Sequence, residues 1–514
     1  MEEKKRRLGT SAFVLVLGGF ICKCLGALFR LPLTNLLGFE GIGVFQLIMS
    51  LYSFCLVLTC GGVTASLSKL ISSARARQNY AKISTYLRRA TLVCLLSGFA
   101  IGIVFFFAGK YIASFQGISS SSGYLLFVAL LPLGAMLAVF RGFFQGYENM
   151  YPTAISQILE QVAKFGFGLL FASYFGKNGI SSGVFGAFLG IVLSEVVALL
   201  FLIGVFLFKK GNLPKLQNLR EIKFVSREFD KVNFMLLLSA SILPLVNAFD
   251  GLVIVPRLVD AGFSSGLATK LFGLQSGIAG AFLNFPLIIS VAVATAFLPN
   301  ISYLISKGAK GKYLMEKGIR VLLLLVLPTT FGLVAISKQV LPIVYTDLSG
   351  KMLDVVFELM LFGAFSIIFT ALMQYFVMLL QANGDFRFIV IITSIGGILK
   401  GLATVILAGI SSVNVFAIVL GNILMSAFVC VCALVKLKSK FGLQFCFVEL
   451  FLILFGTAVM AVTVYTFIQK NYFTVVVNII LGVILGVFVY IVFSAPVFYS
   501  IIKKKSGVFK TKRS

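Results

Sequence analysis

GVFGAFLGIVLSEVVALLFLIGVFLF, at residues 183–208, is the stretch that decides the fold class. It carries a single ionisable side chain, that of Glu195. A hydrocarbon core about 30 Å thick is crossed by roughly 20 apolar residues in a helix. The stretch therefore predicts a membrane-spanning helix with one carboxyl group at membrane depth.

Stretches of this kind recur along all 514 residues and leave no room for a sizeable soluble domain. Only 12% of the residues are charged, against about 25% in soluble proteins. A basic start before the first apolar run imitates a signal peptide, but no small-x-small cleavage site follows, so we expect a retained helix. We predict an all-α integral membrane protein of about fourteen helices. The expected spans are 10–37, 44–68, 90–110, 122–142, 152–175, 183–208, 232–256, 267–303, 318–336, 353–380, 388–408, 414–435, 447–468 and 473–500.

The net charge of +27 follows from where the 44 Lys and Arg residues lie. With the N-terminus inside, most of them fall in segments on the cytoplasmic side, as the positive-inside rule requires. We predict a multi-pass protein of the bacterial cytoplasmic membrane with both termini in the cytoplasm. The basic clusters then contact anionic membrane lipids, and nucleic acid is not an expected partner, because no fold or motif supports it.

The chain is expected to contain two parallel lobes of six helices each. Internal similarity supports this division, since Gln145 aligns with Gln381 and Lys164 with Lys400 at one common offset. Parallel repeats of this type are related by an axis along the membrane normal. The predicted boundaries are 1–208 for the first lobe, 209–231 for a cytoplasmic linker, 232–440 for the second lobe, 441–500 for two added helices and 501–514 for a basic tail.

Ionisable side chains at membrane depth are the candidate functional residues, because each costs roughly 2.5–3.5 kcal/mol if it faces lipid. Five are basic and three acidic, which predicts a net-cationic cavity suited to an anionic substrate such as a pyrophosphate head group. A cation exporter is expected to show the opposite balance. The eight residues are Lys23, Arg30, Glu160, Lys164, Glu195, Asp250, Lys270 and Lys400.

Two of these residues have the spacing of a helical ion pair. Glu160 and Lys164 are four residues apart and are able to pair on one helix face. Such pairs can also be purely structural, and this alternative stays open. Lys164 and Lys400 occupy equivalent places in the two repeats, so we expect them to face each other across the cavity. Arg30 lies near the outer interface, where a long side chain is able to snorkel.

Glycines and one proline suggest how the helices pack and move. Asn284 and Pro286 lie at mid-depth of the long span 267–303, where they predict either a gating kink or a static bend. Pairs of glycines four residues apart let helices approach closely. These pairs are Gly98/Gly102, Gly142/Gly146, Gly186/Gly190, Gly273/Gly277 and Gly397/Gly401.

Signatures of enzymes are missing from the sequence. There is no phosphate-binding Gly-x4-Gly-Lys-Ser/Thr loop and no histidine for a triad or a metal site. The eight cysteines lie in spans or on the cytoplasmic side, where thiols stay reduced, and we interpret them as packing residues. We therefore predict a transporter without cofactor or metal, coupled to H⁺, Na⁺ or another gradient.

The segment from Phe140 to Lys164, FRGFFQGYENMYPTAISQILEQVAK, resembles the stage V sporulation protein B-like group. This group contains polysaccharide-type transporters of the multidrug/oligosaccharidyl-lipid/polysaccharide superfamily and is related to the lipid II flippases. Further matching stretches are 25–43, 68–70, 268–270 and 380–383. The likeness covers most of the first twelve helices and fades around 247–259 and in the last two.

The resemblance implies a flippase that moves a polyprenyl-pyrophosphate-linked sugar by alternating access. The matching basic positions imply diphosphate contacts by Lys23, Arg30, Lys164 and Lys400, with Glu160 and Glu195 orienting them or responding to protons. Lysine stands where arginine is expected at positions 23 and 164, which keeps the charge but loses the bidentate fork. The related flippases also imply a groove for a lipid tail near the two added helices. Arg141 matches as well, in a place where we expect it only to fix a loop.

Two alternatives to the flippase stay open. The first is an ion-coupled exporter of small organic cations on the same architecture, with Glu160, Glu195 and Asp250 as coupling carboxylates. The second is a membrane scaffold for wall synthesis that transports nothing. We expect a monomer, and an association with cell-wall synthesis enzymes is left open.

Overall fold

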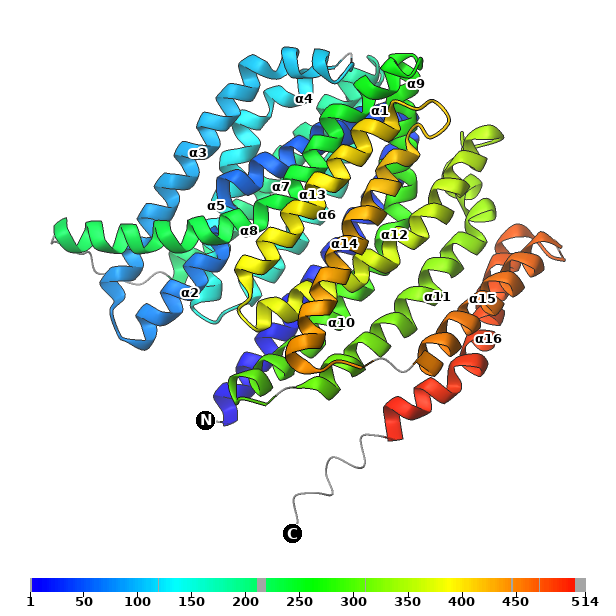
Figure 1. Cartoon of the computed structure of the whole chain (residues 1–514). Helices are drawn as coiled ribbons and strands as arrows, with labels where there is room; N and C mark the ends of the chain where they lie inside the picture. The colour runs from blue at the N-terminus through cyan, green and yellow to red at the C-terminus, as the bar shows by residue number, and fades with distance from the viewer. Residues whose placement is uncertain are drawn as a thin grey trace, which may run out of the picture. The chain divides into compact units, whose positions relative to one another are not determined.

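The computed structural model describes residues 2–118, 120–209, 219–309, 311–444, 447–470 and 472–503, and every regular element among them is a helix (Figure 1). The helices are α1 (Glu2–Cys60), α2 (Val63–Ala76), α3 (Tyr80–Phe115), α4 (Ser122–Leu125), α5 (Phe127–Gly146), α6 (Tyr151–Gly176), α7 (Ile180–Lys209), α8 (Leu219–Asp260), α9 (Ser265–Phe272), the π-helix η1 (Gly273–Ala279), α10 (Gly280–Ser306), α11 (Lys312–Val344), α12 (Lys351–Ala382), α13 (Phe386–Ala408), α14 (Phe416–Phe441), α15 (Phe447–Gln469) and α16 (Val475–Lys503).

Twelve candidate spans in the described part are long and apolar enough to cross a membrane, which confirms the all-α multi-pass class. One of them, Leu17–Ala76, covers the predicted spans 10–37 and 44–68 together. The predicted span 152–175 forms α6, which is not among the twelve. Since α6 packs against α1 and α7, which both are, it belongs to the same helix bundle.

A kink at Gly38 separates the first two predicted spans. The backbone there has φ 70° and ψ 176°, so α1 consists of two helical segments joined without a loop. Only glycine adopts this conformation without a steric penalty from a Cβ atom. The sequence predicted the break between the spans, but the glycine replaces the loop that was expected.

The described residues form two compact units. The N-terminal unit comprises residues 1–277 and 401–417, and the C-terminal unit comprises 278–400 and 418–514. The N-terminal unit therefore includes α8 and α9. Helix α8 begins at Leu219, inside the predicted linker, whereas 210–218 and the tail from 504 onward lie outside the described residues. The predicted boundaries of the lobes stay predictions.

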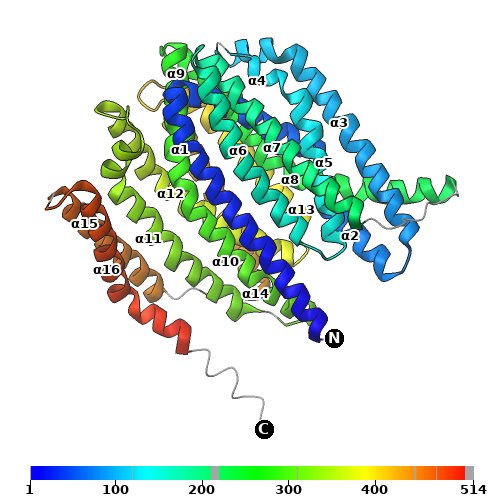
Figure 2. The same ribbon diagram turned by 180° about the vertical axis from the view of Figure 1, so that it is seen from behind.

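Close helix contacts hold the N-terminal unit together, and α6 and α7 lie side by side in it (Figure 2). A Cβ atom at Gly186 would lie 2.3 Å from the carbonyl oxygen of Phe171, and one at Gly190 would lie 2.4 Å from Gly168. These positions confirm the close approach that the glycine spacing predicted. Only residues without a side chain permit backbones to pack at this distance.

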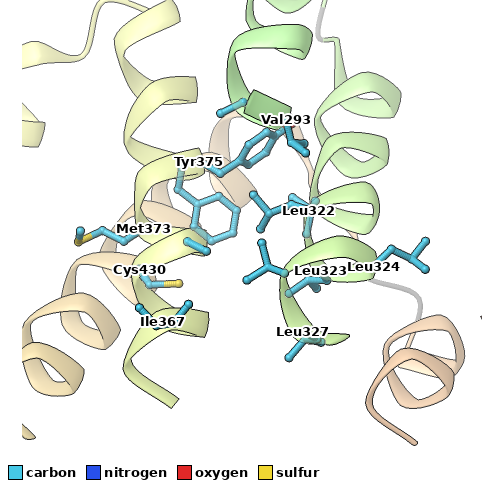
Figure 3. Close-up of a cluster of buried hydrophobic side chains, with 14 of the residues drawn as sticks. Val293, Leu322, Leu323, Leu324, Leu327, Ile367, Met373, Tyr375 and Cys430 are labelled. Atoms are coloured by element: carbon cyan, nitrogen blue, oxygen red, sulfur yellow. The ribbon is translucent and has the colours of Figure 1, made fainter. Parts of the chain in front are cut away.

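An apolar cluster forms the core of the C-terminal unit (Figure 3). Leu322 and Leu327 of α11 pack there with Ile367 and Tyr375 of α12, and all four side chains are buried. The Tyr375 hydroxyl donates a hydrogen bond to the Met315 carbonyl oxygen at 3.2 Å. The one polar atom of the ring is thus satisfied inside the core, as a buried hydroxyl requires.

Candidate functional site

The N-terminal unit holds an ion pair between α5 and α6. The Arg141 Nη2 atom lies 2.6 Å from the Glu160 Oε2 atom, and both side chains are largely buried. The Arg141 Nε atom also donates to the Ser156 hydroxyl at 3.1 Å. The predicted pairing of Glu160 with Lys164 is therefore wrong. The guanidinium group thus donates through two of its nitrogens to two acceptors one turn apart on α6, in the fixed fork geometry of arginine.

Lys164 is left as a cation without an ion-pair partner among the described residues. Its Nζ atom lies 5.2 Å from the centre of the Phe29 ring of α1, and the side chain is half-buried. A ring face attracts a cation without neutralising its charge. The ammonium group is therefore available to an anion, which is what a cavity that binds a phosphate group needs.

Arg30 shares this region with Lys164. Helix α1 runs along α6, since a Cβ atom at Gly26 would meet the Gln161 side chain and Phe29 lies against Gly168. Arg30 lies within electrostatic range of Lys164 and is half-buried. Lys23, two turns earlier on α1, is exposed. The structure thus brings Arg30 close to Lys164, as a shared anion site requires.

Glu195 on α7 is the most deeply buried of the predicted carboxyl groups, with 4% of its surface exposed. The Tyr52 hydroxyl of α1 donates a hydrogen bond to its Oε1 atom at 2.6 Å. Its Oε2 atom is buried and has no hydrogen-bond partner in the described part of the chain. Nothing in the sequence marked Tyr52, because a tyrosine in an apolar span looks like an ordinary packing residue.

The remaining predicted site residues lie elsewhere. The Asp250 side chain of α8 is buried and accepts a hydrogen bond from Thr404 of α13 at 3.1 Å. The Lys270 Nζ atom lies 5.7 Å from the centre of the Phe39 ring. Lys400 is buried in α13 and belongs to the C-terminal unit. Its predicted position opposite Lys164 stays a prediction.

The irregular part of the long predicted span 267–303 precedes the two residues expected to kink it. Residues Gly273–Ala279 form a π-helix, whereas Asn284 and Pro286 lie within α10. Pro286 is buried and Asn284 is exposed. Short π-helical segments often mark functional sites. The gating role of Asn284 and Pro286 stays a prediction, and the π-helix is a second candidate in the same span.

A seam of very close contacts joins the α1 kink region to α9 and η1. A Cβ atom at Gly43 would lie 2.2 Å from the Thr269 carbonyl oxygen, and one at Gly273 would lie 2.1 Å from the Phe39 carbonyl oxygen. We call these four residues the glycine seam. Because no side chain fits at either glycine, the seam depends on backbone packing alone.

Two hydrogen bonds join neighbouring parts of the N-terminal unit. The Gln116 amide, next to α3, donates to the Gly251 carbonyl oxygen of α8 at 2.8 Å. The Ser265 hydroxyl of α9 donates to the Gly117 carbonyl oxygen. Both bonds end on backbone carbonyls of segments far apart in the sequence, so they fasten α8 and α9 to the residues that follow α3.

The C-terminal unit contains an apolar groove of about 530 Å³ between α10, α11, α15 and α16. Thr329 and Tyr490 are the polar side chains that line it. The Tyr490 hydroxyl donates to the Leu324 carbonyl oxygen at 2.9 Å and is therefore satisfied. Apolar lining residues include Phe282, Pro286, Pro328, Gly332, Met460, Val464, Gly486 and Phe498. The groove is lined by both added helices, near which a lipid-tail groove was expected, and its occupation by a lipid tail stays a prediction.

A polar clamp lies one turn from this groove. The Arg320 Nε atom of α11 lies 2.9 Å from the Glu449 Oε2 atom of α15, and both side chains are largely buried. The Ser500 hydroxyl of α16 donates to Glu449 at 2.9 Å. The clamp thus fastens both added helices to α11 and fixes one wall of the groove.

The described residues contain no group of three or more cysteine, aspartate or glutamate side chains that could hold a metal ion. Seven of the eight cysteines are free, including the closely spaced Cys22 and Cys24, and Cys446 lies outside the described residues. The prediction that the thiols serve packing agrees with the burial of Cys55 and Cys94.

Comparisons with known proteins agree with this geometry. A family model described as "Polysaccharide biosynthesis protein" matches residues 8–305. Stage V sporulation protein B of Bacillus subtilis (strain 168) is 28% identical over 322 residues, which cover 60% of this chain and 61% of that protein. Lipid II flippase MurJ of the same organism is 23% identical over 355 residues, 64% of each chain. These matches span less than two thirds of the relatives' lengths.

A solved structure shows the same fold over nearly the whole chain. The structure described as "Lipid II flippase MurJ, inward closed conformation" has a TM-score of 0.72 and 14% sequence identity. The match covers 95% of this chain and 100% of that one. It therefore extends well beyond residues 8–305, which the family model matches.

Proposed function

Since the chain belongs to the polysaccharide biosynthesis protein family, we propose that it is a flippase for a polyprenyl-pyrophosphate-linked sugar. The observation that carries the proposal is the Lys164 ammonium group, which is half-buried in the helix bundle and lacks a carboxylate partner in the described part of the chain. A cation in such a place is costly unless an anion joins it. A diphosphate is an anion of this kind.

The head group is bound in the N-terminal unit under this proposal. Arg30 and Lys164 contact the diphosphate, and Lys23 supplies further positive charge at the exposed end of the same face of α1. Arg141 does not take part, because Glu160 already neutralises it. Lys270, in the same unit, is a further candidate contact. The names of the two relatives from B. subtilis support a role in the assembly of a cell-wall or spore-wall polymer.

The lipid tail is accommodated by the C-terminal unit. The groove between α10, α11, α15 and α16 is lined almost wholly by apolar side chains. A polyprenyl chain gains nothing from polar contacts and packs against such a surface by dispersion. A groove of this kind favours a lipid-linked sugar over a free sugar phosphate, which has no apolar part to place there.

Transport is proposed to occur by alternating access in the bacterial cytoplasmic membrane, with both termini in the cytoplasm. In this topology the glycine seam and the Gln116 bond lie toward the outer face and close it. Separation of the seam would expose the site to the outside. Because its contacts join the two glycines to backbone carbonyl groups, the seam can part without breaking an ion pair.

The export of organic cations is less well supported by the same residues. Of its three candidate carboxylates, Glu160 is paired with Arg141 and Asp250 accepts from Thr404. Among these three, Glu195 is the one with a fully buried oxygen that has no hydrogen-bond partner in the described part of the chain. The basic excess around Lys164 would also repel a cationic substrate.

The test is a head-group exposure assay in proteoliposomes that contain lipid II. Wild-type protein should expose the head group on the opposite leaflet faster than empty liposomes do. Lys164→Ala should lower the rate at least tenfold, whereas Lys177→Ala, at the exposed end of α6, should leave it unchanged. A wild-type rate equal to that of empty liposomes, under either sign of membrane potential, would exclude this substrate.

A further inference from the structure

The two oxygens of the Glu195 carboxyl group have different surroundings. Oε1 accepts the hydrogen bond from Tyr52, whereas Oε2 is buried and receives none from the described residues. An ionised carboxylate offers about four acceptor positions, and a buried one is stable only when donors fill them. With one donor among the described residues, the ionised form of this carboxyl group is poorly stabilised. It is well arranged as a carboxylic acid that carries a proton on Oε2.

Four helices pack against α7 around this group, namely α1, α4, α5 and α6. The Tyr124 hydroxyl on α4 is bonded to Gln116 and does not reach Glu195. The titratable and charged groups that face Glu195 are Tyr52 and Cys60 on α1, Arg141 on α5, and Glu160 and Lys164 on α6.

Of the three charged side chains around Glu195, two offset each other and the third does not. Arg141 and Glu160 form a pair 2.6 Å apart, so their charges largely offset each other. Lys164 has no such partner in the described part and is the cation left to stabilise an ionised Glu195. The protonation of Glu195 is thereby tied to whatever binds Lys164.

We propose that Glu195 is a proton-binding site that fills when an anion binds at Lys164. The proton comes from water and adds to Oε2, while Oε1 keeps the hydrogen bond from Tyr52. The inference rests on the proposed function for the identity of the anion, a diphosphate, but not for the proton site itself.

Electrostatics gives the sign of the coupling. A diphosphate at Lys164 offsets the positive charge that stabilises the ionised carboxylate, and it adds negative charge nearby. Both changes favour the protonated form of Glu195. By linkage, a proton on Glu195 strengthens anion binding by the same factor. Substrate and proton therefore bind together, and the net charge that moves with the substrate is smaller than that of the diphosphate alone.

Tyr52 is a positioning residue for this site. Its hydroxyl holds Oε1, so that Oε2 is the oxygen that takes the proton. Gly134 of α5 lies beside both groups, since a Cβ atom there would be in ordinary contact with the Tyr52 hydroxyl at 3.4 Å and with the Glu195 Oε1 atom at 3.5 Å. Since the hydroxyl donates to the carboxyl group, it also favours the ionised form over the protonated one.

The experiment measures proton uptake by the full chain in lipid nanodiscs. Undecaprenyl pyrophosphate is added in weakly buffered solution, and a pH indicator reports the protons taken up as binding is followed separately. Wild type should take up close to one proton for each probe molecule bound. Glu195→Gln should bind the probe without that uptake, and its affinity should no longer depend on pH. Tyr52→Phe should keep the uptake but move its midpoint to higher pH.

The control is Glu358→Gln, which neutralises an exposed carboxylate on α12 and should behave as wild type does. If Glu195→Gln binds the probe and takes up as many protons as wild type, the proton site is overturned while the proposed function stands. If wild type does not bind the probe at all, the proposed function fails. In that case inorganic pyrophosphate, tested in the same way, shows whether an anion at Lys164 still draws a proton to Glu195.

Discussion

The two units of this protein differ in their main internal features, although the C-terminal unit also buries the charged side chain of Lys400. The N-terminal unit places charged groups among its helices, where Arg141 pairs with Glu160, Lys164 stands over an aromatic ring and Glu195 is nearly inaccessible. The C-terminal unit has an apolar groove of about 530 Å³, and its buried ion pair lies to one side of that groove. Both units are bundles of apolar helices, so the difference lies in a few side chains and not in the fold.

This difference indicates which residues of each unit are candidates for a function beyond packing. Charges inside a membrane bundle are expensive, and the N-terminal unit holds several within a few turns of one another. A hollow in a packed core is also unfavourable, because its lining loses dispersion contacts. Each unit thus departs from simple packing in its own way. The proposed substrate, with a charged head and an apolar tail, would account for both departures.

The largest expected effect comes from breaking the ion pairs of the two units. Arg141→Ala and Arg320→Ala should each lower the free energy of unfolding by about 3 kcal/mol, because a buried carboxylate loses its partner. Thermal unfolding in detergent measures this loss. Head-group exposure should fall to the background rate in Arg141→Ala alone, since the unpaired Glu160 then repels the diphosphate.

The control for this pair is Arg89→Ala, which removes a more exposed ion pair with Asp230 and should cost less than about 1 kcal/mol. Equal losses of transport in Arg141→Ala and Arg320→Ala, at equal stability, would show that the ion pair of the N-terminal unit has no special role. The contrast between the units would then be one of stability only.

The glycine seam gives the next largest effect. Gly43→Ala places a Cβ atom 2.2 Å from a backbone oxygen, so the two segments must separate. The cost should be about 2 kcal/mol, in the range of overpacked sites. Gly166→Ala is the matched control, because a Cβ atom there meets nothing within 4 Å. An unchanged melting temperature for Gly43→Ala would contradict the close contact.

The groove should respond to filling with a smaller effect on stability. Gly332 lines it, and a Cβ atom at this position meets only the end of the Met460 side chain, at 3.7 Å. Gly332→Leu should therefore change the free energy of unfolding by less than about 1 kcal/mol. Exposure of a long-chain lipid substrate should slow several-fold, whereas a short-chain analogue should be unaffected. Equal slowing of both substrates would argue against a tail site.

Much of the fold could be predicted from the sequence, because spans of apolar residues and the distribution of lysine and arginine are local features. The limits of most helices followed from them. The kink at Gly38 and the π-helix at Gly273–Ala279 did not, since the first is a backbone conformation that the sequence only permits and the second lies where Gly273 meets the backbone of α1. The two glycine positions were visible, but their conformations were not.

The sequence identified the ionisable residues of the candidate site but not which of them form ion pairs. Lys164 and Glu195 stood out as ionisable residues in apolar spans, whereas the partner of Glu160 was misjudged. Helical spacing favours Lys164 within α6, but tertiary packing brings the stronger partner, Arg141, from α5. Tyr52 carried no signal at all, because its role arises only when α1 meets α7.

The most direct test of the central claim, that Lys164 has no carboxylate partner in the described part of the chain and receives the diphosphate, is a charge-rescue measurement. Head-group exposure of lipid II is compared in proteoliposomes with Lys164→Ala, Lys164→Arg and Lys164→Gln at equal protein insertion. We predict that Lys164→Arg keeps the wild-type rate within about threefold, because arginine preserves the charge and adds a bidentate fork. The two neutral variants should fall at least tenfold. Equal rates in Lys164→Gln and wild type would contradict the claim.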